Sequence, residues 1–258
     1  MLNIINLTKT FNPGTSYELR IFNDFNLHIN KGECTGILGA NGCGKTTLFN
    51  IISGVLRQEK GTVSLNGKNI DQLKENERAR FIGRVHQNPS AGVSPSLTIL
   101  ENISLSDKKC QIFTLRKLIN KQKIESYREI LKTLDLGLEN KLNTEVKYLS
   151  GGQRQSLSLL MATMNKPELL LLDEHTAALD PKTSRLVMEK TQELIKSYNI
   201  TTMMISHNVR DAVKYSDRII MLDKGEIILD VRSGQITEKE LLNIYNSRNY
   251  GSPLQEAV

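Results

Sequence analysis

The feature that most constrains this chain is a glycine-rich segment at residues 39–46, which reads Gly-Ala-Asn-Gly-Cys-Gly-Lys-Thr. An apolar run at residues 35–38 precedes it, and residues 45–53 have apolar positions at helical spacing. Glycines let a chain turn so that consecutive backbone N–H groups point inward, at the helix end that favours negative charge. The segment fits the pattern GxxxxGK followed by Ser or Thr, and it therefore predicts a phosphate-binding loop between a strand and a helix.

The residues of this loop have separate predicted roles. Lys45 is expected to reach the β- and γ-phosphates of a nucleotide, and the Thr46 hydroxyl is expected to bind Mg²⁺. The alternative is a glycine-rich turn with an exposed lysine, which the flanking strand and helix patterns disfavour. The predicted nucleotide-binding residues here are Gly39, Ala40, Asn41, Gly42, Cys43, Gly44, Lys45, Thr46 and Thr47.

Two acids follow an uninterrupted apolar run at residues 169–172. Four consecutive leucines are typical of a strand that is buried on both faces, and ligands bind at the carboxyl ends of parallel strands. Asp173 is therefore expected to hold Mg²⁺, directly or through water, and Glu174 to polarise an attacking water. The alternative is that both acids only stabilise the start of a following helix.

Strand-like and helix-like patterns alternate along much of the chain, which predicts an α/β fold with a mostly parallel sheet. Further short apolar runs lie at residues 202–205 and 219–222, and further helical patterns at residues 182–197, 208–215 and 237–245. Residues 1–34 and 61–70 have extended patterns with glycine turns and predict an antiparallel flank. Residues 98–165 are rich in Lys, Glu and Leu with helical periodicity, as at 124–134, and predict an inserted helical subdomain.

We expect one domain over residues 1–258, in which residues 1–97 and 166–258 form the core and residues 251–258 a loose end. The longest apolar runs have four residues, whereas a membrane-spanning helix needs about 20. The first residues have no signal-peptide pattern. The sequence therefore predicts a soluble protein whose role at a membrane, if it has one, comes through partners.

Composition narrows the class further. The net charge is +6, and the basic residues are scattered, without a basic stripe that carries interleaved aromatics. We therefore expect a solvated surface rather than a nucleic-acid interface. The three cysteines, Cys34, Cys43 and Cys110, form no CxxC pair. This disfavours a zinc site or a disulfide framework and favours a reducing compartment.

A second motif, Leu149-Ser-Gly-Gly-Gln153, opens a helical run at residues 154–164. A capping box between Ser150 and Gln153 explains a helix start but does not explain the paired glycines. The phosphate loop, this motif and the leucine run with its two acids, in this order, resemble the nucleotide-binding domain of ABC ATPases over nearly the whole chain. The resemblance implies a P-loop NTPase core of RecA-like type with an antiparallel β flank and an inserted α-helical subdomain.

The resemblance also implies roles for residues that would carry no signal alone. Gln87 matches the glutamine that senses Mg²⁺ and the γ-phosphate, Asp180 matches the loop that crosses the dimer interface, and His207 matches the histidine that contacts the γ-phosphate. Phe11 takes the place of the adenine-stacking aromatic, and Tyr17 is the alternative because the segment before it looks like an extended loop. The implied catalytic residues are Glu174, His207, Gln87 and Lys45, and the implied Mg²⁺ ligands are Thr46, Gln87 and Asp173.

One copy of each motif implies half of an enzyme. In the ABC ATPases the signature motif of one subunit closes over the ATP of another, so Ser150, Gly151, Gly152 and Gln153, with Asp180, are expected to act on a second copy in a head-to-tail dimer. Many relatives have proline after the catalytic glutamate. Here it is His175, which we do not expect to be catalytic but which could titrate near the chemistry. Cys43 in the loop predicts inhibition by thiol reagents.

The resemblance implies an ATP-hydrolysing subunit of a transporter, peripheral on the cytoplasmic face of the cell membrane. We expect import of a small solute through a separate permease with an extracytoplasmic solute-binding protein, since the segment at 169–183 is similar to a group that works with a permease of the branched-chain amino acid type and a lipoprotein receptor. Some members are assigned to aromatic amino acid uptake. The alternatives are an exporter motor, or a soluble ABC ATPase acting on ribosomes or DNA. The acids, Lys45 and His207 argue against a non-hydrolysing module.

Overall fold

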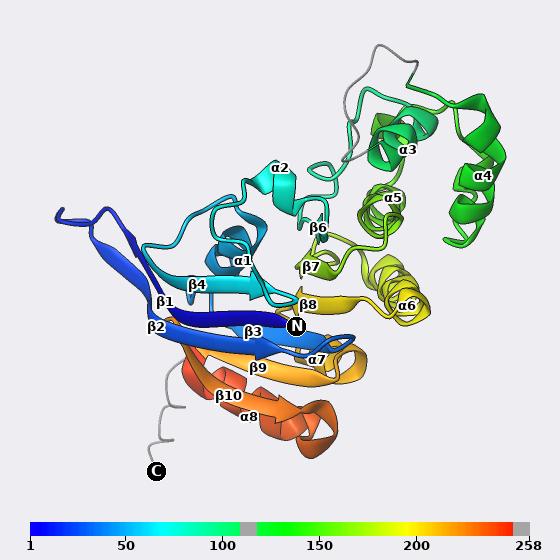
Figure 1. Cartoon of the computed structure of the whole chain (residues 1–258). Helices are drawn as coiled ribbons and strands as arrows, with labels where there is room; N and C mark the ends of the chain where they lie inside the picture. The colour runs from blue at the N-terminus through cyan, green and yellow to red at the C-terminus, as the bar shows by residue number, and fades with distance from the viewer. Residues whose placement is uncertain (109–117, 250–258) are drawn as a thin grey trace. The chain divides into compact units, whose positions relative to one another are not determined.

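The structure is a computed structural model that describes residues 1–108 and 118–249, so Cys110 and the loose end expected at 251–258 lie outside the described residues. The chain divides into two compact units (Figure 1). Unit 1 is Met1–Arg78 with Thr201–Val258, and unit 2 is Ala79–Ile200. Each unit is described by itself below.

Unit 1 is built around a strand that is buried along its whole length. β3 (Cys34–Gly39) pairs in parallel with β8 (Thr201–Ile205) on one side and β9 (Arg218–Asp223) on the other. β10 (Glu226–Arg232) then pairs antiparallel with β9. Because β3 has strands on both edges and is covered on both faces, only apolar or small residues fit there, as the sequence pattern indicated.

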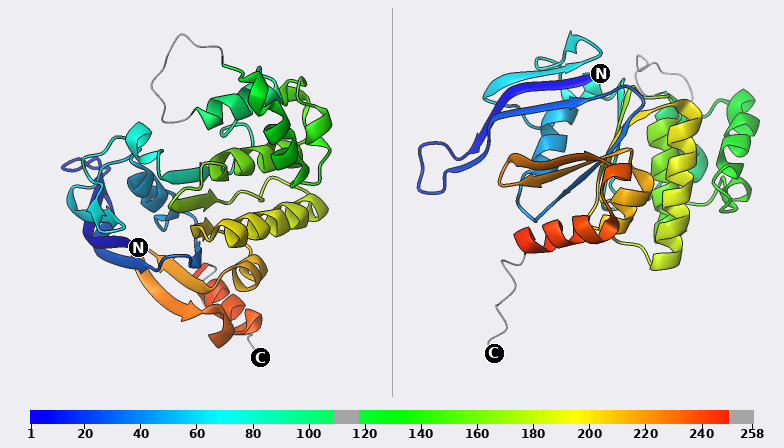
Figure 2. Two further views of the ribbon diagram at one scale, coloured as in Figure 1. Left: turned by 45° about the vertical axis from the view of Figure 1, so that its right-hand side comes forward. Right: turned by 90° about the horizontal axis from the view of Figure 1, so that it is seen from below.

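Helices lie on both faces of this sheet. The helices of unit 1 are α1 (Lys45–Ser53), α2 (Glu75–Arg78), α7 (Val209–Tyr215) and α8 (Glu238–Asn249), with a short 3₁₀ turn, η4 (Ser233–Gln235). Leu241 of α8 is fully buried in a cluster with Leu38 of β3 and Met221 of β9. The views in Figure 2 show α7 and α8 against one face of the sheet, and α1 with the second sheet of unit 1 over the other.

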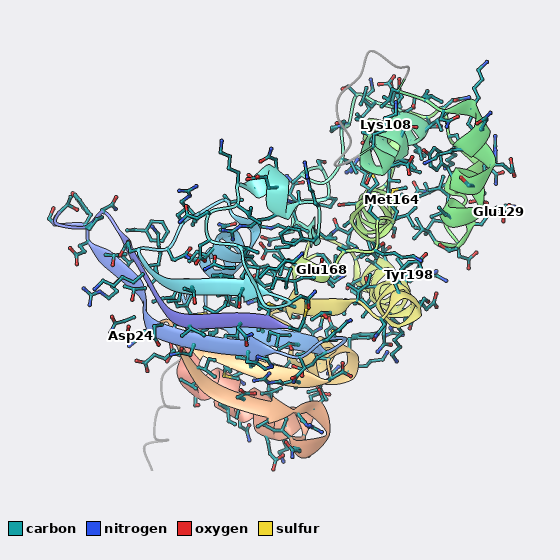
Figure 3. The ribbon with its side chains drawn as sticks, in the orientation of Figure 1. Asp24, Lys108, Glu129, Met164, Glu168 and Tyr198 are labelled. Carbon is teal, nitrogen blue, oxygen red and sulfur yellow. The ribbon has the colours of Figure 1, made fainter. Side chains whose placement is uncertain are left out.

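The second sheet is the antiparallel flank that the first residues predicted. β1 (Leu2–Phe11) lies between β2 (Leu19–Ile29) and β4 (Lys60–Leu65), and the short β5 (Lys68–Asn69) continues the sheet beyond β4. The register of β1 against β2 shifts several times, and Asp24, labelled in Figure 3, adopts a left-handed φ of 52° on β2. Such irregularities bend a strand, so the flank is a curved ribbon rather than a flat one.

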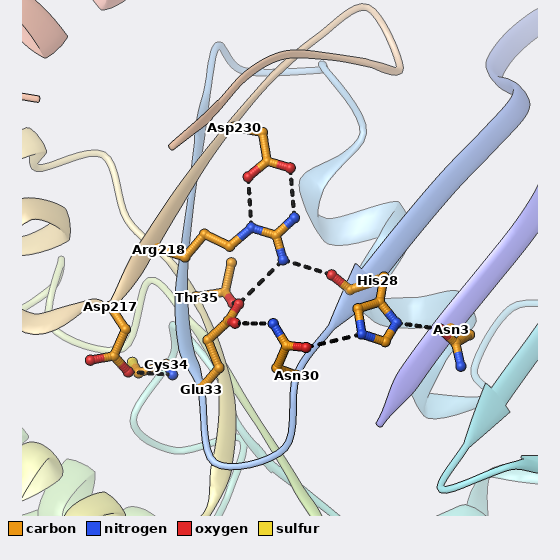
Figure 4. A network of polar contacts seen from close by, with 9 residues as sticks. All are labelled: Asn3, His28, Asn30, Glu33, Cys34, Thr35, Asp217, Arg218 and Asp230. Atoms are coloured by element: carbon orange, nitrogen blue, oxygen red, sulfur yellow. Dashed lines mark hydrogen bonds and ion pairs between the residues drawn. The ribbon is translucent and has the colours of Figure 1, made fainter. Parts of the chain in front are cut away.

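Arg218 at the start of β9 joins the two sheets of unit 1 (Figure 4). Its guanidinium donates to both carboxylate oxygens of Asp230 on β10, each at 2.6 Å, and to the main-chain oxygen of His28 on β2 at 2.7 Å. Glu33 lies 3.3 Å from the same guanidinium and also accepts a hydrogen bond from Asn30 at 2.6 Å. The hydrogen bonds to Asp230 raise the pKa of Arg218 above its ordinary value. The cluster ties the flank to the buried sheet through charge-assisted hydrogen bonds.

The described residues of unit 2 form a two-stranded parallel pair, four α-helices and three short 3₁₀ turns. β6 (Ile82–Val85) pairs with β7 (Leu169–Asp173) in register from Ile82 opposite Leu169 to Val85 opposite Leu172. The helical elements are α3 (Ile99–Asp107), η1 (Lys121–Lys123), α4 (Ile124–Lys132), η2 (Leu138–Asn140), η3 (Val146–Tyr148), α5 (Gly151–Thr163) and α6 (Pro181–Tyr198). Figure 3 labels Met164 and Glu168 at the two ends of the connection from α5 to β7.

An apolar cluster holds the helical part of unit 2 together. It combines residues of α3, α4 and α5 with the loops between them, from Val93 to Leu160. The stretch at residues 98–165 that was predicted to be helical lies inside this unit. The predicted fold class, an α/β fold with parallel strands, an antiparallel sheet and added helices, is confirmed. No helix among the described residues is long and apolar enough to cross a bilayer.

Candidate functional site

The glycine-rich loop of unit 1 joins β3 to α1, as predicted. All three of its glycines have positive φ values: 150° at Gly39, 80° at Gly42 and 109° at Gly44. Gly44 is the N-cap of α1, and no side chain among the described residues caps this helix. The N–H groups of the first turn have no intrahelical partners, so they remain suited to an anion.

The loop is held by backbone packed against backbone. A Cβ on Gly39 would lie 2.3 Å from the carbonyl oxygen of Leu222, which leaves no room for a side chain. The N–H of Gly225, in the turn between β9 and β10, donates to the carbonyl oxygen of Cys43 at 3.1 Å. The turn after β9 therefore fixes the shape of a loop that is far away in sequence.

Lys45 is buried, with 5% of its surface exposed, and its ammonium lies within this loop. Nζ donates to the carbonyl oxygens of Gly39 at 2.7 Å and Ala40 at 2.9 Å. Among the described residues of unit 1, no carboxylate forms an ion pair with it. A buried cation without an opposite charge is costly, and a bound phosphate would supply that charge. The loop therefore fits the phosphates of a nucleoside triphosphate.

Cys43 lies in the same loop, but its thiol is not well placed for reaction. Only 4% of the residue is exposed, and burial raises the pKa of the thiol above its ordinary value. The thiolate is the reactive form of cysteine, and burial disfavours it. The expectation that thiol reagents inhibit through Cys43 is therefore not supported by its environment.

Two further predicted site residues lie in unit 1. His207 follows β8, is exposed, and places Nδ1 3.4 Å from the hydroxyl of Tyr245 on α8. Phe11 ends β1, and the ammonium of Lys9 lies 5.4 Å from its ring centroid. Tyr17 lies in the loop between β1 and β2 and is 80% exposed. The loop exists as predicted, and both aromatic candidates for adenine stacking remain open.

The acids lie at the carboxyl end of β7 in unit 2, where the sequence placed them. Asp173 is only 8% exposed, and its Oδ2 accepts a hydrogen bond from the guanidinium of Arg84 on β6 at 3.1 Å. Glu174 follows with a left-handed φ of 47°, and its carbonyl accepts from the N–H of Ala177 at 3.0 Å. A non-glycine residue in this region stores about 1–3 kcal/mol of strain and is common at functional sites.

His175 is a buried neutral histidine rather than a titrating one. Its Nε2 lies 3.1 Å from the hydroxyl of Thr191 on α6, and that hydroxyl donates to the carbonyl oxygen of Val187 at 2.7 Å. The hydroxyl can therefore only accept from the ring, which fixes the proton on Nε2. Burial lowers the pKa of His175 to about 4. His175 therefore gains its proton below the physiological pH range, and not within it as the sequence analysis allowed.

Ser150 and Gln153 form the capping box at the start of α5. The Ser150 side chain accepts from the N–H of Gln153, and the Gln153 side chain accepts from the N–H of Ser150. The glycines between them have a packing reason, because a Cβ on Gly152 would lie 2.1 Å from the methyl of Thr183 on α6. α5 and α6 therefore approach closely at Gly152, which the cap alone did not explain.

The remaining predicted residues of unit 2 lie in loops. Asp180 is the N-cap of α6, and hydrogen bonds from Thr183 lower the pKa of its carboxyl below the ordinary value. Gln87 is exposed just after β6. The sequence analysis missed Gln155, whose buried amide donates to the carbonyl oxygen of His86 at 3.1 Å and so holds the loop of Gln87. A buried polar residue on the apolar side of a helix was the available signal.

The candidate residues fall into two groups, one in each unit. Unit 1 brings together the loop around Lys45, with His207 and the aromatic candidates in the same unit. Unit 2 carries the remaining residues: Gln87, Ser150, Gly151, Gly152, Gln153, Asp173, Glu174 and Asp180. The carboxylate of Asp173 is an oxygen donor of the kind that Mg²⁺ prefers, and only its Oδ2 accepts a hydrogen bond from the described residues of unit 2. Asp173 therefore fits a role as a Mg²⁺ ligand.

Known proteins resemble this chain over most of its length. The profile of the family described as ABC transporter matches residues 22–177, more than half of the chain. The chain is 45% identical over 244 residues to the tyrosine transport ATP-binding protein of Clostridioides difficile (strain R20291), with 95% of this chain and 96% of the relative covered. It is 32% identical over 249 residues to a phosphonates import ATP-binding protein of Ruegeria sp. (strain TM1040), with 95% and 94% covered.

Solved structures resemble it as well. A dimeric ATP-binding cassette in a post-hydrolysis state, bound to ADP and Pi, matches with a TM-score of 0.76 at 30% identity, covering 90% of this chain and 99% of that one. A component of a transporter complex from Clostridium perfringens matches with a TM-score of 0.78 at 27% identity, covering 96% of this chain and 94% of that one.

The close approach at Gly152 can be measured with a double-mutant cycle. Gly152→Ala should lower the free energy of unfolding by at least about 1 kcal/mol more in the wild-type background than in a Thr183→Ser background, because serine lacks the methyl that the new Cβ meets. Urea unfolding of the four proteins gives the coupling. Gly151→Ala is the control, since its Cβ would meet only the tip of Leu179 at 3.3 Å. Equal losses in both backgrounds would contradict the packing argument.

The buried histidine should make stability depend on pH. The folded chain binds a proton at His175 only near pH 4, whereas the unfolded chain has an ordinary pKa, so unfolding takes up a proton as the pH falls below about 6.5. The resulting loss is about 2 kcal/mol between roughly pH 7.5 and pH 5. His175→Gln keeps a donor for Thr191 and should remove this part of the pH dependence in urea unfolding. An unchanged pH dependence would mean that His175 already charges in the folded protein.

Proposed function

This chain belongs to the ABC transporter family of ATP-binding proteins, and from this premise we propose that it energises the import of a small solute through a separate permease. Its family makes it an ATPase coupled to transport. The observation that carries the residue assignments is the buried ammonium of Lys45 inside a loop whose helix has no side-chain cap. Such a loop is stabilised by phosphate and destabilised without it.

The phosphate contacts are assigned to the loop. We propose that backbone N–H groups from Gly39 to Thr47 surround the phosphates of ATP, and that Lys45 moves its ammonium from its present carbonyl partners to phosphate oxygens. Phe11 or Tyr17 stacks on the adenine. Stacking on an aromatic ring needs a free face, and the exposure of Tyr17 makes it the more accessible of the two.

The hydrolysis step is assigned to acidic and polar side chains named above. Glu174 accepts a proton from the attacking water, whose oxygen bonds to the γ-phosphorus as the bond to the β,γ-bridging oxygen breaks and ADP leaves. His207 and Gln87 contact the γ-phosphate. Thr46, Gln87 and Asp173 are the proposed ligands of Mg²⁺, which when bound neutralises charge on the phosphate oxygens. Glu174 has a left-handed backbone, a conformation that non-glycine residues adopt most often at functional sites.

The proposed active form contains two copies of the chain. Cassettes of this family form dimers, as in the structure bound to ADP and Pi. We propose that Ser150, Gly151, Gly152, Gln153 and Asp180 of one copy act on the ATP bound by the other. The exposed N-cap serine and a first turn of α5 without an acidic residue suit a second contact with phosphate.

A pocket in unit 2 is the proposed docking place of the permease. It has a volume of about 380 Å³ and is lined by the β6 end, α3 and α5, with Leu105, Met161 and Ala162 among its residues. Leu105 is 37% exposed, an apolar side chain that a helix of the permease can cover. The chain would then lie peripherally on the cytoplasmic face of the membrane. A solute-binding protein outside would complete the complex.

An amino acid is the proposed solute. The 45% identical relative is named for tyrosine transport, whereas relatives named for phosphonates, choline, or spermidine and putrescine are 32–36% identical. The solute would pass through the permease and never touch this chain, so the proposal depends on shared ancestry of the whole transporter. The alternative is an ATPase that acts on ribosomes or DNA. Identification of the proteins that purify with the tagged chain, described below, distinguishes it from a transporter subunit.

The assigned roles of Glu174 and Lys45 predict different defects. Glu174→Gln should keep ATP binding, accumulate an ATP-bound dimer and reduce hydrolysis at saturating ATP by about a hundredfold or more, because the amide cannot accept a proton. Lys45→Ala should lose nucleotide binding itself. Phosphate release and size-exclusion chromatography with ATP measure both. Full hydrolysis by Glu174→Gln would show that another group is the general base.

The transport proposal is tested by the partners of the tagged chain. Purification from detergent-solubilised membranes, followed by mass spectrometry, should recover a multi-spanning permease and a solute-binding lipoprotein. Met161→Glu should lose the permease and keep ATP binding, because it places a charge in the apolar part of the pocket. Recovery of ribosomal or DNA-binding proteins without a membrane partner would overturn the transport claim and leave the ATPase chemistry intact.

A further inference from the structure

Arg84 is a charged residue inside a short strand that is otherwise buried. Its neighbours in β6 are apolar or glycine, and its side chain is 13% exposed. A buried guanidinium is costly unless an opposite charge lies beside it. In unit 2 that opposite charge is Asp173, whose own side chain is 11% exposed.

The strand register places Arg84 and Asp173 on the same face of the parallel pair. Arg84 lies opposite Leu171 in the parallel pair of β6 and β7. Side chains two positions apart on a strand project to the same face, so Asp173 projects beside Leu171 and toward Arg84. The pairing is a single hydrogen bond from the guanidinium to Oδ2 at 3.1 Å, rather than a bidentate one. Among the described residues of unit 2, no other group donates to this carboxylate.

We propose that Arg84 is the counter-ion of Asp173 in the absence of nucleotide, and that its positive charge makes metal binding at Asp173 depend on ATP. This rests on the proposed function of Asp173 as a Mg²⁺ ligand. The pair of Arg84 and Asp173 is neutral, so it does not attract a bare divalent cation. ATP brings negative charge with the metal, and this charge offsets the repulsion from Arg84.

The pocket of unit 2 offers the Arg84 guanidinium a second position. Arg84 lines the pocket of unit 2, together with Ser94, Ser106 and Ser158. When the carboxylate turns to a metal, the guanidinium can swing toward this space and hydrogen-bond to hydroxyl groups there. A single hydrogen bond to Oδ2 is lost more easily than a bidentate pair would be.

The test measures binding of Mn²⁺, a paramagnetic substitute for Mg²⁺, to the full chain without nucleotide. Arg84→Gln keeps a hydrogen-bond donor for Asp173 but removes the charge. It should bind Mn²⁺ about tenfold more tightly than the wild type or better. The gain should disappear in Arg84→Gln combined with Asp173→Asn. Arg84→Lys keeps the charge and should bind Mn²⁺ as weakly as the wild type, and Arg80→Met, at an exposed position before β6, should change nothing.

Three outcomes would overturn the proposal. They are no gain in a folded Arg84→Gln protein, a gain that persists without the Asp173 carboxylate, and a gain in Arg84→Lys. The last keeps the proposal open to refutation even if Arg84→Gln does not fold. Binding of a fluorescent ATP analogue by the wild type is measured separately. If the wild type did not bind the ATP analogue, the result would count against the proposed function. If it bound the analogue but Arg84→Gln left the Mn²⁺ affinity unchanged, the result would count only against the proposed role of Arg84.

Discussion

Backbone packed directly on backbone around the phosphate loop is the constraint on which unit 1 depends. At Gly39 the nearest neighbour of a side chain would be the carbonyl oxygen of Leu222, and at Gly225 it would be that of Ile21, only 1.8 Å away. No side chain fits at either point. Since Gly225 also donates to the carbonyl of Cys43, the loop, the turn after β9 and the start of β2 form one rigid frame. The N–H groups of α1 are thereby aimed before any anion arrives, which lowers the cost of binding one.

Two buried polar groups of unit 2, at positions 173 and 175, are satisfied in different ways, one by an ion pair and one by a neutral hydrogen bond. Asp173 is paired with the guanidinium of Arg84. His175 stays neutral because a hydroxyl that can only accept fixes its proton and because burial disfavours the imidazolium. Glu174 lies between them in a left-handed conformation. The strand end is thus anchored on both sides of the proposed general base, once by charge and once by a neutral hydrogen bond to α6.

Short-range patterns in the sequence predicted the elements well. α1 spans Lys45–Ser53 as expected, because Gly44 and Gly54, both left-handed, bound it at each end. The expected helix at 182–197 became Pro181–Tyr198, since Asp180 caps it and proline suits a first helical position. The loop and the two acids were also found, because each motif is a continuous segment in a fixed strand or helix context.

What the sequence could not predict are contacts that depend on register between distant segments. Nothing local indicates that Arg84 meets Asp173, that Gly152 meets Thr183, or that the proton of His175 is fixed by α6. Each of these pairings depends on the register between segments that are far apart in the sequence. A short stretch of sequence does not contain that information. A charge inside an apolar strand and a histidine in place of proline were visible, but their partners were not.

The pairing of β3 sets the order in which the molecule can be assembled. Its partners are residues 202–205 on one edge and 218–222 on the other. A ribosome adds roughly 5–20 residues per second, so β3 waits on the order of ten seconds for β8 to be made. During that time an apolar strand with two open edges emerges with nothing to pair with, which is the kind of segment that chaperones shield. The loop that is easiest to recognise in the sequence is therefore among the last parts of the protein to take shape during synthesis.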